Sequence, residues 1–123
     1  MRFMTFVRHS EKYNDAAPPA LTEAGGKFME KLVKDGTFVE GGGLFASKDS
    51  ARIRLSGGKV TVKDGPFTES KEVIGGWAIL EAESIAEVVR IEAEFWELYR
   101  KHWPEFEGES EVRPMFENRY QGE

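Results

Sequence analysis

The sequence predicts an α+β fold in which an antiparallel sheet carries two helices on one face. Three observations lead to this prediction. Two segments have apolar residues at helical spacing, several others alternate or are continuously apolar as strands are, and a Gly-Gly pair separates two of the alternating segments. The 123 residues fit a single domain, residues 1–123, with one hydrophobic core.

The first third of the chain predicts a strand, a loop and a helix. Residues 2–8 alternate with apolar groups on both sides, which is typical of an internal strand. Residues 9–20 are polar and contain a Pro-Pro pair, so they predict a loop across the surface. Thr22 can cap the following helix, whose apolar positions have helical spacing, and Gly36 is well placed to end it.

Residues 37–46 predict a second strand, interrupted by three consecutive glycines at positions 41 to 43. Gly41, Gly43 and Ala46 formally match the G-x-G-x-x-A fingerprint of dinucleotide-binding folds. That fingerprint has to open a helix, whereas a polar turn and another strand follow here. A bulge or a close backbone approach is therefore the better interpretation of the glycines.

The clearest local signal is a hairpin formed by residues 51–56 and 59–63 around a Gly-Gly loop. Such a loop favours the primed turns and sets the register of the two strands. The predicted pairs are Ser56–Lys59, Leu55–Val60 and Ile53–Val62, which places the apolar pairs on one face. The opposite face is basic and carries Arg52, Arg54, Lys59 and Lys63. This basic face is either solvated or a surface for an anion, for the acidic half of this chain or for a partner chain.

Residues 73–82 are almost continuously apolar and predict a central strand. Ser84 and Glu87 form a capping box that opens a helix running to about His102, and Pro104 stops this helix. The predicted buried stripe of the helix consists of Ile85, Val88, Val89, Phe95, Trp96 and Tyr99. Its predicted outer surface is acidic and consists of Glu87, Glu92, Glu94 and Glu97.

Residues 111–116 predict a short strand, in which Pro114 suits a sheet edge or a strand end. The predicted elements then follow the order β-α-β, hairpin, β-α-β. This order is that of a ferredoxin-like fold with one added β-hairpin. Because two helices leave one face of a strongly apolar sheet uncovered, we expect a homodimer.

Composition argues against several classes of function. The formal net charge is −5; residues 1–63 carry 11 bases and 7 acids, and residues 64–123 carry 6 bases and 15 acids. An acidic chain lacks the excess of Lys and Arg that general nucleic-acid binding needs. The absence of cysteine excludes disulfides, cysteine-ligated metals and thiol catalysis. Two histidines without metal-ligand spacing predict no metal site, and an N-terminus without a signal peptide or membrane span leads us to expect a soluble cytosolic protein.

Residues 62–77 carry the most specific motif of the chain. It reads Asp64-Gly65-Pro66-Phe67, followed by a short charged run with Glu69, Lys71 and Glu72 and then by Gly75-Gly76-Trp77. In this segment the chain resembles the YCII-related family, in particular the subgroup named for its D-G-P-F motif. The resemblance is closest from this motif to the final predicted strand and looser over the N-terminal strand and helix.

The resemblance implies a ferredoxin-like homodimer in the dimeric α+β barrel style, usually with a cleft beside the sheet. It implies no settled biochemical role. For YCII-like proteins an enzymatic role is suggested by a histidine and an aspartate that recur around the cleft. Asp64 matches the aspartate, whereas the second strand, where relatives tend to carry the histidine, has three glycines here.

A His-carboxylate pair can serve as general base and orienter in acid–base chemistry on a small metabolite, if His9 reaches Asp64. Both residues lie where predicted strands meet loops, a common place for functional sites. Alternatively, Asp64 bonds backbone N–H groups of its own turn and His9 is a surface residue. The candidate ligand-binding residues are Phe67, Glu69, Lys71, Trp77, Arg54 and Arg113; for Arg113 we favour pairing with acids of the C-terminal half.

Two functions therefore remain open at this stage. One is an enzyme that needs no cofactor, with Asp64 and His9 as acid–base groups near the D-G-P-F turn. The other is a non-catalytic dimer that binds a metabolite or a protein, with the D-G-P-F turn as a structural hinge. A small anionic or aromatic ligand is expected in either case, and neither nucleic acid nor a membrane is an expected partner.

Overall fold

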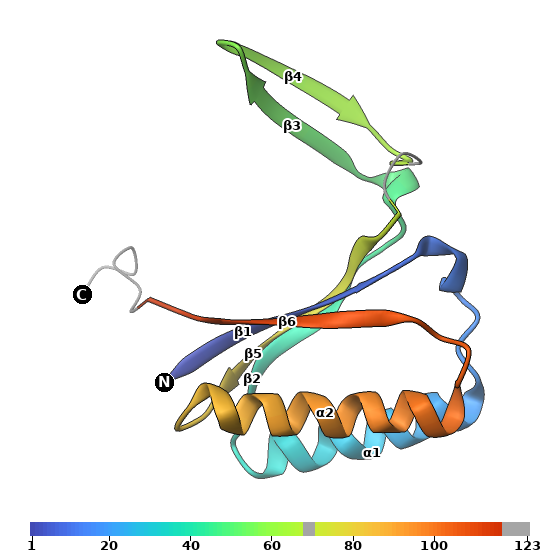
Figure 1. The fold of residues 1–123 in the computed structure, drawn as a ribbon, viewed down its shortest axis with the longest axis vertical. Helices are drawn as coiled ribbons and strands as arrows, with labels where there is room; N and C mark the ends of the chain where they lie inside the picture. Colours follow the sequence, from blue (N-terminus) through green and yellow to red (C-terminus); the bar gives the residue numbers. More distant parts are fainter. Residues whose placement is uncertain (68–70, 117–123) are drawn as a thin grey trace.

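The computed structural model describes residues 1–67 and 71–116 and has an α+β architecture (Figure 1). A four-stranded antiparallel sheet has the order β2-β5-β1-β6, and a separate two-stranded sheet pairs β3 with β4. The strands of the larger sheet are β1 (Arg2–His9), β2 (Phe38–Gly43), β5 (Val73–Glu81) and β6 (Gly108–Pro114). The remaining elements are β3 (Ala51–Ser56), β4 (Lys59–Asp64), α1 (Pro19–Lys34) and α2 (Ile85–His102).

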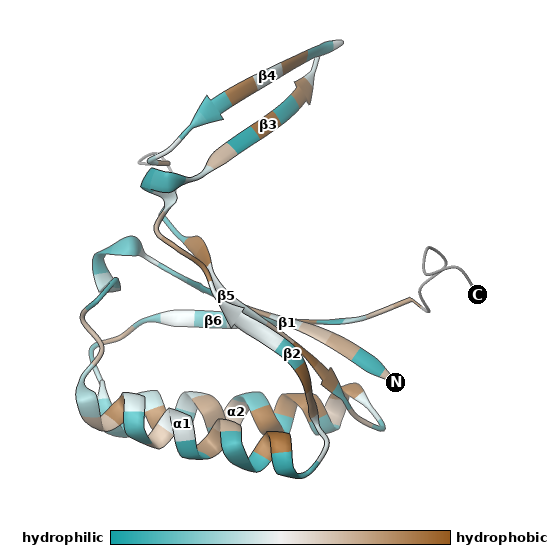
Figure 2. Cartoon of the chain, turned by 180° about the vertical axis from the view of Figure 1, so that it is seen from behind, coloured by the Kyte–Doolittle hydropathy of each residue, from teal (hydrophilic) through white to brown (hydrophobic). Residues whose placement is uncertain are grey.

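Both helices lie against one face of the four-stranded sheet (Figures 1 and 2). The core between the two layers centres on Phe3, Leu80, Ala82 and Val88, each at most 7% exposed. Phe3 and Leu80 are cross-strand partners in β1 and β5, so the centre of the core rests on the two central strands of the sheet. None of the described helices covers the opposite face of the sheet.

The helix ends follow the capping rules with one correction. Ser84 accepts a hydrogen bond from the Glu87 backbone N–H, and the Glu87 carboxylate accepts one from the Glu83 N–H, which confirms the predicted capping signal of α2. The prediction of Thr22 as the cap of α1 is wrong, because this helix begins at Pro19 with Pro18 as its N-cap residue. Proline suits the first helical position, since its fixed φ is already helical and its missing N–H needs no partner there.

The predicted faces of α2 also need correction. Glu92 was expected on the outer surface, but it faces the sheet, and one of its carboxylate oxygens is buried. Ile85 and Val89 were expected in the buried stripe, but they are 47% and 53% exposed. The observed inner stripe runs through Val88, Glu92, Phe95 and Tyr99, a regular spacing of four, three and four residues. This stripe was not recognised in the sequence, because one of its positions is occupied by a charged residue, Glu92.

The hairpin register is confirmed at all three predicted pairs. Every residue of β3 and β4 is exposed, and the hairpin projects from the sheet on the side opposite the helices (Figure 1). Hydrophobic and hydrophilic residues alternate along both strands (Figure 2). Consequently the hairpin has an apolar face and a basic face, and neither is part of the core.

Two short 3₁₀ turns, Glu11–Tyr13 and Ser47–Asp49, lie in segments that were predicted as a loop and a polar turn. The second strand ends at Gly43, before the predicted limit. A Cβ at Gly41 would lie 2.6 Å from the Trp77 carbonyl oxygen, and the pairing shifts register between Phe38 and Glu40. The close backbone approach is therefore confirmed at Gly41, whereas the irregularity in the pairing lies just before the three glycines. In the described part of the chain, no helix has the length and apolarity that crossing a membrane requires.

Candidate functional site

The D-G-P-F motif attaches the hairpin to the rest of the molecule. The Gly65 N–H donates to the Ser50 carbonyl at 2.8 Å, and a Cβ at Gly65 would lie only 1.6 Å from the Ser47 carbonyl oxygen. The Phe67 N–H donates to the Ser47 hydroxyl at 3.0 Å, and the Phe67 side chain is buried. The motif therefore contributes a close backbone contact and a buried aromatic ring at the base of the hairpin.

Glu11 completes this attachment from the first 3₁₀ turn. Its two carboxylate oxygens accept hydrogen bonds from the Ser47 N–H and the Ser47 hydroxyl, both at 2.6 Å. These bonds, led by the one from the backbone, hold the pKa of Glu11 below its ordinary value. No local sequence pattern predicts this pair, since 36 residues separate the partners.

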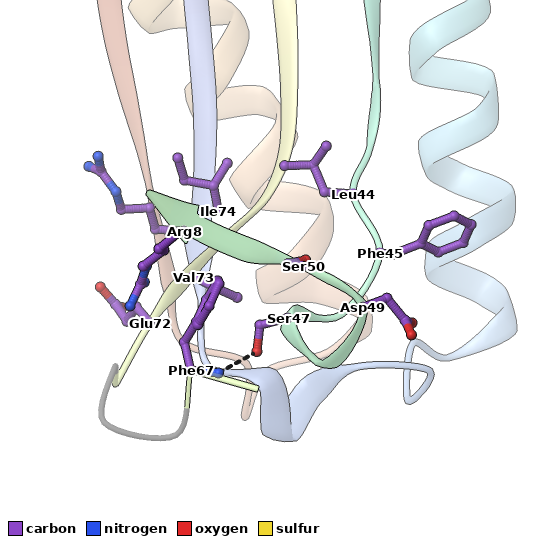
Figure 3. Close-up of a pocket in the computed structure, with 11 residues that line it drawn as sticks. Arg8, Leu44, Phe45, Ser47, Asp49, Ser50, Phe67, Glu72, Val73 and Ile74 are labelled. Atoms are coloured by element: carbon purple, nitrogen blue, oxygen red, sulfur yellow. Dashed lines mark hydrogen bonds between the residues drawn. The ribbon is translucent and has the colours of Figure 1, made fainter. Parts of the chain in front are cut away.

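Next to Phe67 lies a cleft of about 570 Å³ between the hairpin base and the sheet (Figure 3). The guanidinium carbon of Arg52, on the basic face of the hairpin, lies 4.0 Å from the centroid of the Phe67 ring. This distance is typical of a cation–π contact. Eleven residues line the cleft: Arg8, Leu44, Phe45, Ser47, Asp49, Ser50, Arg52, Phe67, Glu72, Val73 and Ile74.

Arg8, at one wall of the cleft, belongs to a charged cluster on β1 and β6. Its guanidinium donates to one oxygen of Glu111, and Arg113 donates to the other at 3.1 Å. The hydrogen bond from Arg8 is the largest cause that lowers the pKa of Glu111, and the same bond raises the pKa of Arg8. The expected pairing of Arg113 with an acid of the C-terminal half is therefore confirmed.

His9 lies at the end of β1 in a second, largely aromatic cavity of about 280 Å³. Its Nδ1 is 3.0 Å from the Ser10 carbonyl oxygen, and a Cβ at Gly75 would lie 2.0 Å from its Nε2. Gly75 thus makes room for the imidazole. The Phe106 ring is 5.6 Å away, and Tyr99, whose pKa is raised by burial, lines the same cavity.

Asp64 is the last residue of β4, opposite Ala51, and it is exposed. Within residues 1–67 and 71–116, no described hydrogen bond, ring contact or cavity joins Asp64 to His9. The acid–base pair expected from the sequence is thus not assembled by the described contacts, and each residue's catalytic role stays a prediction.

The other candidate residues are scattered over the molecule. Lys71 is exposed, and Arg54 lies on the basic face of the hairpin two residues beyond Arg52, outside the cleft. Trp77 is half-buried and borders a third cavity, between the sheet and the helices. Glu69 lies outside the described residues. Of the candidates within the described residues, Phe67 is the one that lines the cleft at the hairpin base.

Across the described ranges, no group of three or more His, Asp and Glu side chains is arranged to hold a metal ion. The polar contacts at the cleft and at His9 are instead hydrogen bonds and ring contacts within the protein.

Comparison with known proteins places the chain in a family. Residues 1–95 match the family model of the YCII-related domain, from β1 into α2. No curated protein matches the chain significantly. The matched segment contains the D-G-P-F motif, the hairpin and both 3₁₀ turns, and it also covers the first strand and helix, where the resemblance had been looser. Because the match spans most of its length, the protein belongs to the YCII-related family.

Proposed function

We propose that this YCII-related protein is a homodimeric, non-catalytic binding protein that takes up a small organic anion in the cleft at the hairpin base. One observation carries the proposal. The buried ring of Phe67 holds the guanidinium of Arg52 at 4.0 Å, at the wall of a cleft of about 570 Å³. The D-G-P-F segment in turn fixes Phe67 through Ser47 and Glu11.

The chemistry of the cleft suits a small carboxylate with an apolar body. A guanidinium has five N–H donors in one plane, so Arg52 can add a bond to a ligand carboxylate beside the contacts that it already makes. Phe67, Val73 and Ile74 offer apolar contact to the rest of such a ligand. Asp49 and Glu72 also line the cleft, so it carries both signs of charge and favours a singly charged anion over a polyanion.

Catalysis by His9 is a second candidate function, and one observation favours it. If Nδ1 donates its proton to the Ser10 carbonyl, Nε2 is left as the acceptor, as a general base requires. The exposed position of Asp64 and its separation from His9 in the described contacts favour binding over a His-Asp mechanism.

A dimer is supported by apolar surface in two places. Ile53, Leu55, Val60 and Val62 of the hairpin are 66–75% exposed, and Met4, Phe6 and Ile79 lie on the sheet face opposite the core. The sheet order β2-β5-β1-β6 supports a ferredoxin-like fold, and we propose that two such faces pack into a dimeric α+β barrel. The D-G-P-F motif itself supports membership of the subgroup that bears its name.

The binding proposal is tested with benzoate, phenylacetate and phenyl phosphate as probes, by calorimetry and by amide chemical shifts. We expect at least one of the carboxylates to bind, and Arg52→Gln to weaken its affinity about 10-fold or more. Arg54→Gln is the matched control, because it removes the same charge from the same face outside the cleft. Binding of none of the probes, or equal loss in both variants, would contradict the proposal.

The oligomeric state is tested by light scattering coupled to size exclusion. We expect twice the monomer mass of 13.9 kDa for the wild type and a shift toward the monomer for Leu55→Lys. A wild-type mass of one chain at micromolar concentration would rule the dimer out.

A further inference from the structure

His9 lies on the helix side of the sheet, at the end of β1. Thr5 and Val7 precede it at every second position, and both line the cavity between the sheet and the helices. Because side chains alternate along a strand, the imidazole points to the same side as these two residues. There it lies over Gly75, the residue of β5 that the pairing of β1 with β5 skips. The bulge at Gly75 thus leaves the space that the ring occupies.

The imidazole of His9 offers one accessible acceptor. Its Nδ1 lies 3.0 Å from the Ser10 carbonyl oxygen, and since a carbonyl can only accept, Nδ1 carries the proton of this hydrogen bond. In the neutral ring Nε2 is then an acceptor. Nε2 has no hydrogen-bond partner among the described residues, yet it keeps contact with solvent, because their one unpaired and inaccessible side-chain atom belongs to Glu92. A ligand in the cavity around His9 can therefore bring a donor to Nε2.

Aromatic side chains form much of the wall of this cavity, which has a volume of about 280 Å³. The aromatic residues that line it are Tyr13, Phe95, Tyr99, Trp103 and Phe106. Neighbouring ring centroids in this group lie 4.5–6.3 Å apart, so the rings form one continuous surface. Aromatic faces attract cations, and the Tyr13 ring already contacts the ammonium group of Lys12 at 5.0 Å from its centroid.

The charges of the lining also favour a cation. Asp15 contributes a carboxylate, and neither Lys nor Arg is among the described residues that line the cavity. An anion would be repelled by Asp15, whereas an ammonium ion would be attracted by it. Asp15 has a φ of 61°, in the left-handed region that aspartate and asparagine tolerate better than most residues.

We propose that this cavity is a second ligand site, for a small organic ammonium ion. One N–H of the ion donates to Nε2 of His9, its apolar groups lie against the aromatic rings, and Asp15 balances its charge. A cavity of about 150 Å³ can hold benzene, so about 280 Å³ has room for an ammonium ion with an alkyl or aryl group. The cavity shares no lining residue with the cleft at the hairpin base, so the site does not depend on the function proposed for that cleft.

The test compares three probes of similar size: tert-butylammonium, tert-butanol and tetramethylammonium. The alcohol keeps a donor but lacks the charge, and tetramethylammonium keeps the charge but lacks the N–H group. Affinities are measured by titration of amide chemical shifts in the full chain. We expect tert-butylammonium to bind about 10-fold more tightly than either of the others, because it combines the hydrogen bond with the cation–π contacts. The shifts should centre on Gly75, Gly76 and Tyr99, which line the cavity.

Two variants separate the contacts of the ligand. His9→Leu removes the acceptor, and we expect the preference for tert-butylammonium over tetramethylammonium to disappear. Asp15→Asn removes the charge but keeps a residue type that tolerates the positive φ, and both ammonium probes should bind it about 3-fold more weakly. Asp35→Asn is the matched control, since Asp35 is exposed at the end of α1 and outside the cavity, and it should leave all three affinities unchanged.

A third variant keeps the test decisive should His9→Leu fail to fold. Gly76 pairs with Val7, so a Cβ at Gly76 would point to the helix side of the sheet. Its nearest neighbouring atom would be 3.4 Å away, an ordinary contact, so the fold should accept Gly76→Ala. The added methyl group narrows the cavity, and we expect all three probes to bind this variant more weakly. Unchanged affinities in Gly76→Ala would reject the site.

Several further outcomes would overturn the proposal. They are equal affinity of the three probes for the wild type, no binding of any of them, or a preference for tert-butylammonium that survives in His9→Leu. Tightest binding of tert-butanol, or unchanged affinity of the ammonium probes in Asp15→Asn, would reject a cation as the ligand. Shifts centred on Ser47 and Phe67 would place the probes in the cleft at the hairpin base instead.

Discussion

The body of the protein and its hairpin are both built from antiparallel strands, yet they are held in different ways. β1 and β5 contain Phe3 and Leu80, which are almost completely buried against the helices. β3 and β4 pair in perfect register, yet every one of their residues is exposed. The comparison shows that strand pairing can be set locally by turn chemistry, whereas stability comes from the burial of a face.

None of the strand residues of the hairpin is buried in the core, and polar contacts at its base help to hold it in place. Gly65 packs against the Ser47 backbone, and the Phe67 N–H donates to the Ser47 hydroxyl. The Glu11 carboxylate accepts from both the N–H and the hydroxyl of Ser47. A single serine thus links the motif, the second 3₁₀ turn and the first 3₁₀ turn. The hairpin is thus held at its base by these polar contacts together with the buried ring of Phe67.

The largest expected effect comes from making the same substitution in both regions. Leu80→Ala removes a fully buried side chain and should destabilise the monomer by about 2–5 kcal/mol. Leu55→Ala, in the 73% exposed apolar face of the hairpin, should change the unfolding free energy by less than about 0.5 kcal/mol. Urea unfolding measured under monomeric conditions checks both values. A Leu55→Ala effect as large as that of Leu80→Ala would mean that the hairpin is packed within the monomer.

A smaller effect is expected from two glycine substitutions. Gly65→Ala would place a methyl group 1.6 Å from the Ser47 carbonyl, so the hairpin base must move, at a cost of about 1–3 kcal/mol. Gly26→Ala meets no atom within 4 Å and lies inside α1, where alanine is favoured by about 1 kcal/mol. Thermal unfolding should therefore show opposite shifts for the two variants. A Gly65→Ala variant as stable as the wild type would show that the close contact with Ser47 is unimportant.

The smallest expected effects are on the pH dependence of stability. One carboxyl group in each region should contribute to it, and the two contributions should have opposite signs. Glu11 has a folded-state pKa below its ordinary 4.5, so it stabilises the fold above that value and loses this contribution as pH falls through the folded pKa. Glu92 has a folded-state pKa above 4.5, so it destabilises the fold once pH exceeds the folded pKa, and this cost vanishes below the ordinary value.

Glu11→Gln should therefore lower the melting temperature at about pH 7, and Glu92→Gln should raise it, with both differences shrinking toward about pH 4. Differential scanning fluorimetry at the two pH values measures both. Shifts of the same sign would contradict the opposite pKa directions of the two carboxyl groups.

Local chemistry explains which parts of the fold could be predicted from the sequence. The hairpin register followed from Gly57-Gly58, and the start of α2 followed from Ser84 and Glu87, because each signal acts over a few residues. The start of α1 was placed too late, because Thr22 looked like a cap while Pro19 was already suited to the first helical position.

The candidate site was harder to predict, because it depends on contacts between distant segments. Glu11 and Ser47 meet across 36 residues, and nothing in the residues around either one indicates the other. Glu92 was placed on the outer surface because charged residues are rarely buried, although its spacing from Val88 and Phe95 is that of the inner stripe. Phe67 was recognised through its motif, but its contact with Arg52 is visible only in the folded structure.

The basic residues of the hairpin also bear on how copies of the protein can meet. Among the described strands, β3 and β4 pair only with each other, so each presents an open edge of unpaired backbone groups. Open edges invite strand-to-strand aggregation, and nearby positive charges on both partners oppose it. The basic residues beside these edges are Arg52, Arg54, Lys59 and Lys63. We expect them to discourage growth into an extended intermolecular sheet.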